Sequence, residues 1–373
     1  MTLKDDSEEK WIYTEHAKVK HEILSKYITS WSKILGKFYN LNIFDCFAGR
    51  GKYANGEEGS PLKIIKILIN LRKKTGKPRK AKFFFIEANK KNFKMLESEV
   101  KGYVREDLDW LDINIFQGEF SDTISTILEN HSSDISPGFF FIDPFGFGGI
   151  PLKKIEKLLS YERTEVFITF MIRDVIRFLE SPTHQKSIKD LFGYENILKR
   201  INEKPYDNLI KEKALLKLYR NQLHTQAKVK YTLPFKVNSD NKIQTTYYLI
   251  HCTNHPKGCA LMKDIMYNSG TPGRYGYLGP VEGQLSLDFY FEVDKLKPYL
   301  LNKFKNRKLT FAEVKHESLM DTYYITKHFR KAIKELFNEK KINLEKQGSR
   351  GGIKDKTIID FKKKYLDITQ DWN

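Results

Sequence analysis

The chain has 373 residues, long enough for two or three domains with buried cores, which excludes a disordered tail and a small disulfide-stabilised protein. Hydrophobic residues make up 40% of it, and 65 Lys and Arg against 47 Asp and Glu give a net charge of +18. Such a basic surface predicts a polyanionic partner, and nucleic acid is the first class to consider.

The sequence predicts neither a metal site nor a disulfide-bonded fold. The three cysteines, Cys46, Cys252 and Cys259, form no Cys-x-x-Cys pair and have no histidine cluster beside them. The first residues, MTLKDDSEEKW, contain no apolar signal region, and no stretch approaches the roughly 20 apolar residues of a membrane span. We therefore expect a cytoplasmic protein outside the membrane, without a bound metal.

An amphipathic helix is predicted near the N-terminus, over residues 16–39. Its apolar residues recur at helical spacing and form one stripe: Ile23, Leu24, Tyr27, Ile28, Trp31, Ile34, Leu35 and Phe38. Residues 1–40 are predicted to form a helical segment that precedes the first strand.

Five short apolar runs follow, with helical segments between them, at residues 41–47, 81–87, 113–116, 138–143 and 165–171. Runs that are apolar on both faces are typical of parallel strands buried beneath helices. Their alternation with helices predicts a doubly wound, Rossmann-like α/β sheet.

The sheet is predicted to close with an antiparallel hairpin. Residues 172–228 have the pattern of a helical insertion rich in Lys and Arg. Residues 230–237 and 244–253 then form two strand-like runs on either side of the turn signal NSDNK. The α/β domain is predicted to span residues 41–285.

A winged helix is predicted in the C-terminal domain, residues 286–373. Two short helices, residues 308–321 and 322–341, precede the segment INLEKQ, the glycine turn GSRGG and the segment KTIIDFK. Helix, turn, helix and then a β-ribbon is the order of a winged helix. Residues 301–373 carry 18 Lys and Arg against 10 Asp and Glu. This excess favours nucleic-acid binding, with a solvated basic surface or a dimerisation wing as the alternatives.

The candidate site lies where the strands end, because open α/β sheets bind ligands at the carboxyl ends of their strands. Asp45 ends the first run and precedes a loop whose small residues let the backbone approach a nucleoside-type cofactor: Ala48, Gly49 and Gly51. Phe47, in the same loop, is also a candidate cofactor-binding residue. About ten residues separate these glycines from Ser60 and Pro61, which are predicted to cap and open the next helix. A pyrophosphate requires glycines directly at a helix N-terminus, so NAD and FAD are disfavoured. S-adenosylmethionine, which has no phosphate, is the predicted cofactor.

Two acidic residues end the second and third runs. Glu87 follows FFFI and can accept both ribose hydroxyls of a nucleoside, although an exposed acid that caps the next helix also fits. Glu119 follows Gln117 and Gly118, where a side chain can meet the adenine edge, although a plain turn has the same character.

The fourth run predicts the reaction class, because it delivers Asp143, Pro144, Phe145 and Gly146 to the same edge. Methylation of an exocyclic base amine requires an acceptor for its N–H, a backbone carbonyl as second acceptor and a flat ring that stacks on the base. Asp143, the Pro144 carbonyl and Phe145 supply these in order. Compared with the Asp-Pro-Pro-aromatic pattern of amino-methyltransferases, Phe145 replaces the second proline and Gly146 the aromatic residue. An Asp-Pro turn that merely ends a strand is the alternative.

These segments resemble one known family. The three-Cys-motif partner (TcmP) proteins have segments similar to KHEILSKYITSW, DCFAGRGKYANGEEGSPLK, FFFIEANKKNF, FFIDPFGFGGIP, EVFITFMIRD and YYLIHCTNHPKGCALMKDIMY, across essentially the whole chain. The resemblance implies a class I methyltransferase-like domain, a C-terminal winged helix and a partner protein of the radical S-adenosylmethionine type, which carries the three cysteines. The DPFG block is also similar to that of tRNA guanosine N2-dimethyltransferases, which favours a guanine amine.

Seven basic residues are candidates for contact with nucleic acid. Arg50 and Lys52, inside the glycine loop, could reach substrate phosphate or be solvated loop charges. Arg350 lies in the predicted wing. The other four are spaced three and four apart on the helix over 322–341 and so share one face: Lys327, Arg330, Lys331 and Lys334.

Two functions fit the sequence. The first is an S-adenosylmethionine-dependent N-methyltransferase that acts on an exocyclic base amine of nucleic acid, with RNA favoured over DNA, and works with the radical S-adenosylmethionine-type partner. The second is a catalytically silent adaptor that binds nucleic acid and delivers that partner to its target.

Overall fold

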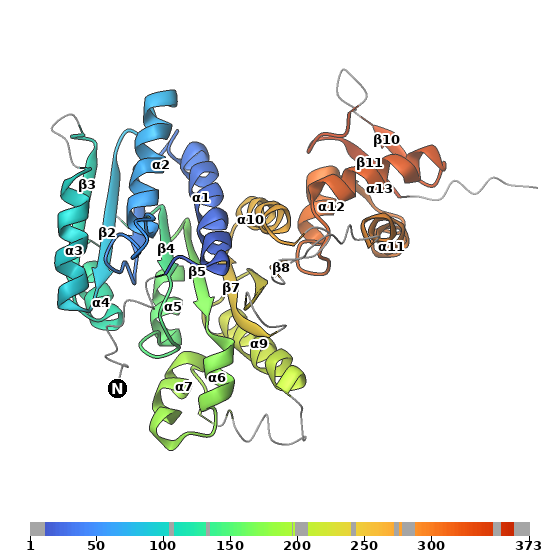
Figure 1. Cartoon of the computed structure of the whole chain (residues 1–373). Helices are drawn as coiled ribbons and strands as arrows, with labels where there is room; N and C mark the ends of the chain where they lie inside the picture. The colour runs from blue at the N-terminus through green and yellow to red at the C-terminus, as the bar shows by residue number, and fades with distance from the viewer. Residues whose placement is uncertain are drawn as a thin grey trace, which may run out of the picture. The chain divides into compact units, whose positions relative to one another are not determined.

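The computed structural model describes residues 12–103, 108–131, 135–195, 197, 208–239, 244–271, 276–277, 288–345 and 352–361. The chain divides into two compact units, Met1–Glu282 and Gly283–Asn373 (Figure 1). Within the described ranges, no helix is both long and apolar enough to cross a membrane.

The described part of the first unit contains an eight-stranded sheet in the order β3-β2-β1-β4-β5-β7-β6-β8. Strands β1 to β5 run parallel, and β7 runs antiparallel to both of its neighbours, β5 and β6. This order confirms the predicted doubly wound, class I methyltransferase-like sheet. The strands are β1 (Leu41–Asp45), β2 (Ala81–Glu87), β3 (Leu111–Gln117), β4 (Gly138–Ile142), β5 (Thr164–Phe170), β6 (Tyr231–Asn238), β7 (Thr245–Thr253) and β8 (Gly276–Tyr277).

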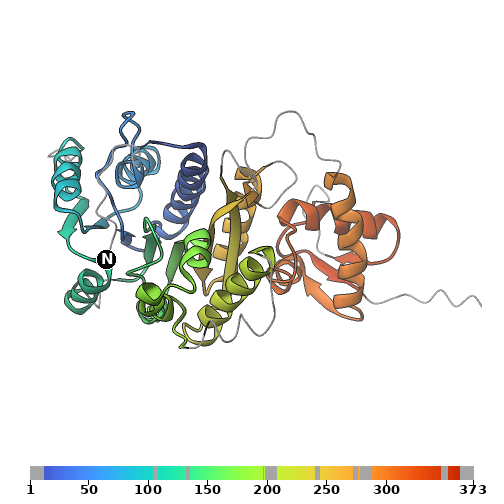
Figure 2. The same ribbon diagram turned by 60° about the horizontal axis from the view of Figure 1, so that its bottom comes forward.

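Helices cover both faces of the sheet, as Figure 2 shows. On one face α1 (Glu15–Leu35) lies beside α2 (Ser60–Thr75) and α10 (Pro256–Ser269), and its Tyr27 and Trp31 rings contact Phe139. The opposite face packs against α4 (Phe120–Asn130), α5 (Leu152–Leu159), α7 (Gln185–Phe192) and α9 (Asn208–Thr225). The chain also forms α3 (Lys90–Lys101), α6 (Ile172–Phe178) and the short 3-10 helix η2 (Pro182–His184).

Stacked phenylalanines hold the three central strands in register. Phe44 of β1 is the register partner of both Phe84 of β2 and Phe140 of β4. The Phe44 ring stacks on Phe84 with centroids 4.4 Å apart and on Phe140 with centroids 4.2 Å apart. Each such pair contributes about 0.5–1.5 kcal/mol beyond its buried area. This packing fixes the relative positions of the strand ends that carry the candidate site.

The N-terminal helix is shorter than its apolar pattern predicts. α1 ends at Leu35, and Gly36 takes the C-cap position. Ile34 and Phe38 are exposed instead of continuing the buried stripe. The prediction was wrong here because the two apolar residues lie at and beyond the last turn, where no neighbouring element covers them in the described structure.

The second unit is a winged helix, as predicted. Its elements follow the order α11 (Asp288–Lys303), β9 (Lys308–Thr310), α12 (Phe311–Glu317), α13 (Thr326–Asn338), β10 (Asn343–Glu345) and β11 (Ile358–Asp360). The strands form a small antiparallel sheet in the order β10-β11-β9. Its core joins all three helices to the sheet through large apolar side chains that include Leu300, Phe311, Phe329, Ile333 and Ile359.

The predicted helix over 308–321 is wrong at its start. Residues 308–310 pair with β11 as a strand, and Thr310 then caps α12. The Thr310 side chain accepts a hydrogen bond from the Glu313 amide, and the Glu313 carboxylate accepts one from the Thr310 amide. This capping box gives the helix a defined first residue.

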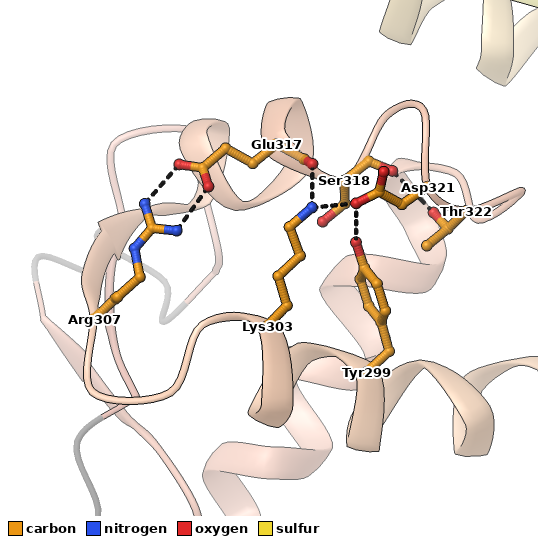
Figure 3. A network of polar contacts seen from close by, with 7 residues as sticks. All are labelled: Tyr299, Lys303, Arg307, Glu317, Ser318, Asp321 and Thr322. Atoms are coloured by element: carbon orange, nitrogen blue, oxygen red, sulfur yellow. Dashed lines mark hydrogen bonds and ion pairs between the residues drawn. The ribbon is translucent and has the colours of Figure 1, made fainter.

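A polar network fixes α11 against the turn between α12 and α13 (Figure 3). Lys303 pairs with Asp321 and donates to the Glu317 carbonyl, while the Tyr299 hydroxyl donates to Asp321 at 3.0 Å. Arg307 makes two hydrogen bonds of 2.8 Å to the Glu317 carboxylate. Both cations therefore stabilise the helix–turn–helix geometry.

Candidate functional site

Three adjacent strands bring three carboxylates to one edge of the sheet. β2, β1 and β4 are parallel neighbours, and Asp45 is in register with Phe85 and Phe141. Glu87 and Asp143 each lie two residues beyond those partners, so all three acids stand at the carboxyl ends of their strands. This is the edge at which open α/β sheets bind ligands.

The loop after β1 is an ordered hairpin. Gly49 and Gly51 have φ values of +66° and +86°, which side chains rarely adopt, and a Cβ at Gly51 would lie 3.2 Å from the Glu99 Cβ. The Gly59 amide donates to the Gly51 carbonyl at 2.7 Å and closes the loop. Gly59 is the N-cap of α2, so the predicted capping by Ser60 is wrong. Ser60 is the first helical residue and hydrogen-bonds to Asp45.

Asp45 is completely buried. Its Oδ1 accepts a hydrogen bond of 3.4 Å from the Phe47 amide. Among the residues that the structure describes, nothing hydrogen-bonds to its other oxygen, Oδ2. Burial raises the pKa of Asp45 to about 7, against hydrogen bonds from Ser60 and Phe47 that lower it, and the charge of Asp143 raises it further. A buried acceptor without a donor suits a ligand that brings an N–H or ammonium group.

We expect Asp45→Asn to remove a pH dependence of stability. Asp45 has a higher pKa in the folded chain than the ordinary 3.8. Its contribution to the free energy of unfolding is therefore fully present below pH 3.8 and is lost as the pH rises to about 7. Relative to wild type, the free energy of unfolding of the asparagine variant should rise over this interval, by at most about 4 kcal/mol, and then level off. Urea denaturation from pH 4 to 8 measures it, and a difference that does not change with pH would contradict the assignment.

Glu87 is buried, and its carboxylate orders the neighbouring backbone. Oε2 accepts from the Gly49 amide at 2.9 Å, and Oε1 accepts from the Asn89 amide at 2.7 Å. The Asn92 side chain also hydrogen-bonds to it. Burial raises its pKa, although these three hydrogen bonds lower it. Asn89 itself caps α3, so Glu87 is not the exposed capping acid of the alternative interpretation.

The acceptor capacity of Glu87 still fits a nucleoside cofactor. An ionised carboxylate offers about four acceptor positions, and three donors already use it. About one position is left for a ribose hydroxyl, fewer than the two that the sequence suggested. Together with the Asp45 oxygen that has no hydrogen-bond donor among the described residues and the glycine loop beside it, this arrangement fits S-adenosylmethionine.

We expect Glu87→Ala to weaken cofactor binding by about 1–3 kcal/mol, the usual cost of losing a hydrogen bond to a charged group. The variant also leaves the Gly49 and Asn89 amides without their acceptor, so its unfolding free energy should fall. Calorimetric titration with S-adenosylhomocysteine measures the first effect. Glu129→Ala, at an exposed acid of α4, is the control. Equal affinity in Glu87→Ala and wild type would remove Glu87 from the site.

The remaining predicted cofactor residues surround these two acids. Phe47 packs against Phe120 with ring centroids 5.6 Å apart, and the buried Ala48 donates its amide to the Ile86 carbonyl. Glu119 is exposed at the N-cap of α4, and its charge raises the pKa of Glu87. Glu87 and Glu119 therefore interact electrostatically across the edge of the sheet.

Asp143 has a partner that the sequence reasoning missed. Lys20 of α1 lies with its Nζ 2.5 Å from the Asp143 Oδ2, and the two side chains are 12% and 19% exposed. Pro144 is buried, whereas the Phe145 ring is 65% exposed. A Cβ at Gly146 would meet nothing within 4 Å. The strand end thus presents a held carboxylate beside an exposed flat ring.

Three further side chains lie near this pair: Tyr13, which precedes α1, His21 of α1 and Tyr53 of the glycine loop. His21 is buried, with its Nε2 3.5 Å from the Tyr53 hydroxyl, and the Tyr13 ring stands 4.9 Å from the Tyr53 ring. Burial lowers the pKa of His21, and the charges of Lys20 and Lys63 lower it further. A signal existed in the sequence, because Lys20 and His21 begin the KHEILSK segment, but nothing local showed that they meet the strand ends.

Arg50 and Lys52 both have partners within the protein, Arg50 in the loop itself and Lys52 in α3. The Arg50 Nε donates to the Lys52 carbonyl at 3.1 Å. The Lys52 Nζ lies 2.6 Å from the Glu99 carboxylate of α3. These contacts favour the interpretation as structural loop charges over contact with substrate phosphate.

The four basic residues predicted on α13 share its exposed face. Phe329, Ile333 and Leu336 are buried on the opposite side. Arg330 lies over the Phe311 ring, 5.6 Å from its centroid. Arg350 lies outside the described residues. The exposed basic residues are Lys327, Arg330, Lys331 and Lys334.

Cysteine and histidine provide no metal site in the described chain. The described residues contain no group of three or more His, Cys, Asp or Glu suited to a metal ion. Cys46, Cys252 and Cys259 are buried free thiols. His251 pairs with Glu165 at 3.0 Å, and His255 caps α10.

A protein-family model matches the part of the chain that forms the winged helix. The model of the GMT-like wHTH domain matches residues 280–348, which include α11 through β10. No curated protein matches the chain in sequence.

Several solved structures are similar to the chain. Protein LPL1258 from Legionella pneumophila str. Philadelphia 1 is 10% identical over 63% of this chain and 84% of that one, with a TM-score of 0.39. Trm1 from Pyrococcus horikoshii, in complex with S-adenosyl-L-methionine, is 11% identical over 96% and 93%, with a TM-score of 0.36. A putative caffeoyl-CoA O-methyltransferase from Staphylococcus aureus is 14% identical over 67% and 93%, with a TM-score of 0.32.

Proposed function

We propose that the chain is an S-adenosylmethionine-dependent methyltransferase that acts on an exocyclic amine of a nucleic-acid base, with RNA favoured over DNA. One observation carries the proposal. Asp143 and the exposed Phe145 ring stand at the same sheet edge as the buried acids Asp45 and Glu87. A site for a base amine therefore adjoins a site for a nucleoside cofactor.

The cofactor would be held by Asp45, the Gly49 backbone and Glu87, and it would supply an electrophilic methyl group. Asp143 accepts the amine N–H through the carboxylate oxygen that Lys20 does not use. The Pro144 carbonyl is the second acceptor, and Phe145 stacks on the base. Orientation of this kind can supply roughly 7–11 kcal/mol of barrier lowering. Asp143 need not be a strong base, because the amine proton can leave after the new bond forms.

The second unit would bind the nucleic acid that carries the target base. The exposed basic face of α13 supports this part of the proposal, because the second helix of a helix–turn–helix is the one that usually enters the groove. The resemblance to the three-Cys-motif partner proteins adds a partner of the radical S-adenosylmethionine type, and that part rests on the resemblance alone.

Transfer of a tritiated methyl group tests the proposal. The chain is incubated with labelled S-adenosylmethionine and either total RNA or total DNA, with and without the partner protein. We expect label in RNA, and heat-denatured chain is the control. Cofactor binding without label in any nucleic acid would contradict the methyltransferase and favour the silent adaptor.

A further inference from the structure

The ion pair between Lys20 and Asp143 joins two segments that lie 123 residues apart in the chain. We infer that Lys20 is a positioning residue, which orients the Asp143 carboxylate toward the substrate amine. The inference rests on the proposed function and adds the N-terminal helix to the reaction site.

Lys20 is itself held in place from several sides. Its Nζ lies over the Tyr247 ring of β7, 5.6 Å from the centroid. The Tyr247 hydroxyl donates to the His16 carbonyl at 3.0 Å and so ties the first turn of α1 to the sheet. Contacts among Tyr13, His21 and Tyr53 tie the same part of α1 to the glycine loop. The ammonium group therefore has a defined position before any substrate arrives.

The pair leaves the carboxylate one oxygen for the reaction. Lys20 occupies the Asp143 Oδ2, and a charge-assisted hydrogen bond of this kind restricts rotation of the carboxylate. The restriction aims Oδ1, which can accept the amine N–H and align the nitrogen lone pair with the methyl group. Without Lys20 the carboxylate would lose this restraint on its rotation.

Stability alone is a weak reason for this pair. Removing two charges largely from water costs desolvation energy that their attraction does not reliably repay. The buried Asp45 carboxylate adds no clear stabilisation to the pair, because it repels Asp143 and attracts Lys20. Because stability is a weak reason for the pair, its presence at the end of β4 is better explained by the orientation that it imposes on the Asp143 carboxylate.

Lys20→Met tests the inference, with Lys20→Arg as the conservative variant and Lys18→Met as the matched control. Lys18 is an exposed lysine of the same helix that pairs only loosely, at 3.6 Å, with Glu15. The readouts are kcat and KM of methyl transfer to RNA, and calorimetric affinities for S-adenosylhomocysteine and methylthioadenosine, which lacks the amino-acid portion.

We expect Lys20→Met to lower kcat by about 10²-fold, the scale of a small misplacement of a reacting group, with KM and both affinities unchanged. Lys20→Arg should recover most of the loss, and Lys18→Met should match wild type. In an Asp143→Asn background, Lys20→Met should cause little further loss, because Lys20 acts through Asp143. Unchanged affinity for S-adenosylhomocysteine also shows that the variant is folded.

Two results would overturn the inference alone. One is an active wild type whose kcat is unchanged in Lys20→Met. The other is a Lys20→Met variant that binds S-adenosylhomocysteine more weakly but methylthioadenosine normally, since Lys20 would then serve the cofactor's carboxylate. A wild type that binds cofactor and methylates no nucleic acid is a different result, which overturns the proposed function and the inference with it.

Discussion

Asp143→Asn is expected to reduce methyl transfer by about 10²- to 10³-fold, the cost of removing one group that stabilises developing charge in a preorganised site. Asparagine has nearly the same shape, so the end of β4 should keep its structure. It lacks the negative charge that balances the ammonium forming on the amine, and it cannot form the ion pair with Lys20. Single-turnover transfer of labelled methyl to RNA measures the effect.

The cofactor affinity of Asp143→Asn distinguishes a specific loss of methyl transfer from general damage to the site. Asp143 is proposed to contact the amine and not the ribose, so titration with S-adenosylhomocysteine should give nearly the wild-type affinity. Asp122→Asn, an exposed acid in the first turn of α4, is the control for loss of one charge. Retained turnover in Asp143→Asn would exclude the proposed role of the Asp143 negative charge in methyl transfer.

Replacing Lys327, Arg330, Lys331 and Lys334 together by Ala is expected to weaken binding to nucleic acids of many sequences. Each cation that neutralises a phosphate releases counterions, and log K falls with log salt by roughly 0.7–0.9 per phosphate. If each of the four contacts one phosphate, the slope of the variant should be smaller by about three. Alanine is a strong helix former and all four positions are exposed, so α13 should remain folded.

The comparison requires a control with the same change of charge. Lys295, Lys305, Lys340 and Lys341 are exposed lysines elsewhere in the second unit, and their replacement by Ala should leave the salt slope near that of wild type. Fluorescence anisotropy with short labelled RNA and DNA over a salt series provides both slopes. If the α13 variant kept the parental slope, its basic face would bind no phosphate, and docking of a protein or dimerisation would replace the nucleic-acid role.

The parallel strands β1 to β5 were predictable because each contains a short apolar run, and β6 and β7 were predictable from the turn signal between them, whereas the two-residue strand β8 was not predicted. Phe44, Phe84 and Phe140 belong to three such runs, and their stacking shows why the runs are so rich in phenylalanine. Asp45, Glu87 and Asp143 could be assigned to one sheet edge for the same reason, since the carboxyl ends of parallel strands meet there.

The features that could not be predicted from the sequence depend on tertiary contacts. No local pattern connects Lys20 with Asp143, because the packing of α1 on the sheet alone brings them together. The Glu87 carboxylate looked available for two ribose hydroxyls, but the neighbouring backbone amides already use part of its capacity. The start of α12 was misplaced because Lys308–Thr310 form a strand too short to have a periodicity of its own.

The identity of the methylated nucleoside tests the central claim most directly. RNA treated with the chain and S-adenosylmethionine bearing a deuterated methyl group is digested to nucleosides and analysed by mass spectrometry, with Asp143→Asn in parallel. We predict deuterated methyl on the exocyclic amine of a base, guanine first, and its near absence in the Asp143→Asn sample. Label on a ribose oxygen or a ring carbon, or equal label in both samples, would contradict the site as described.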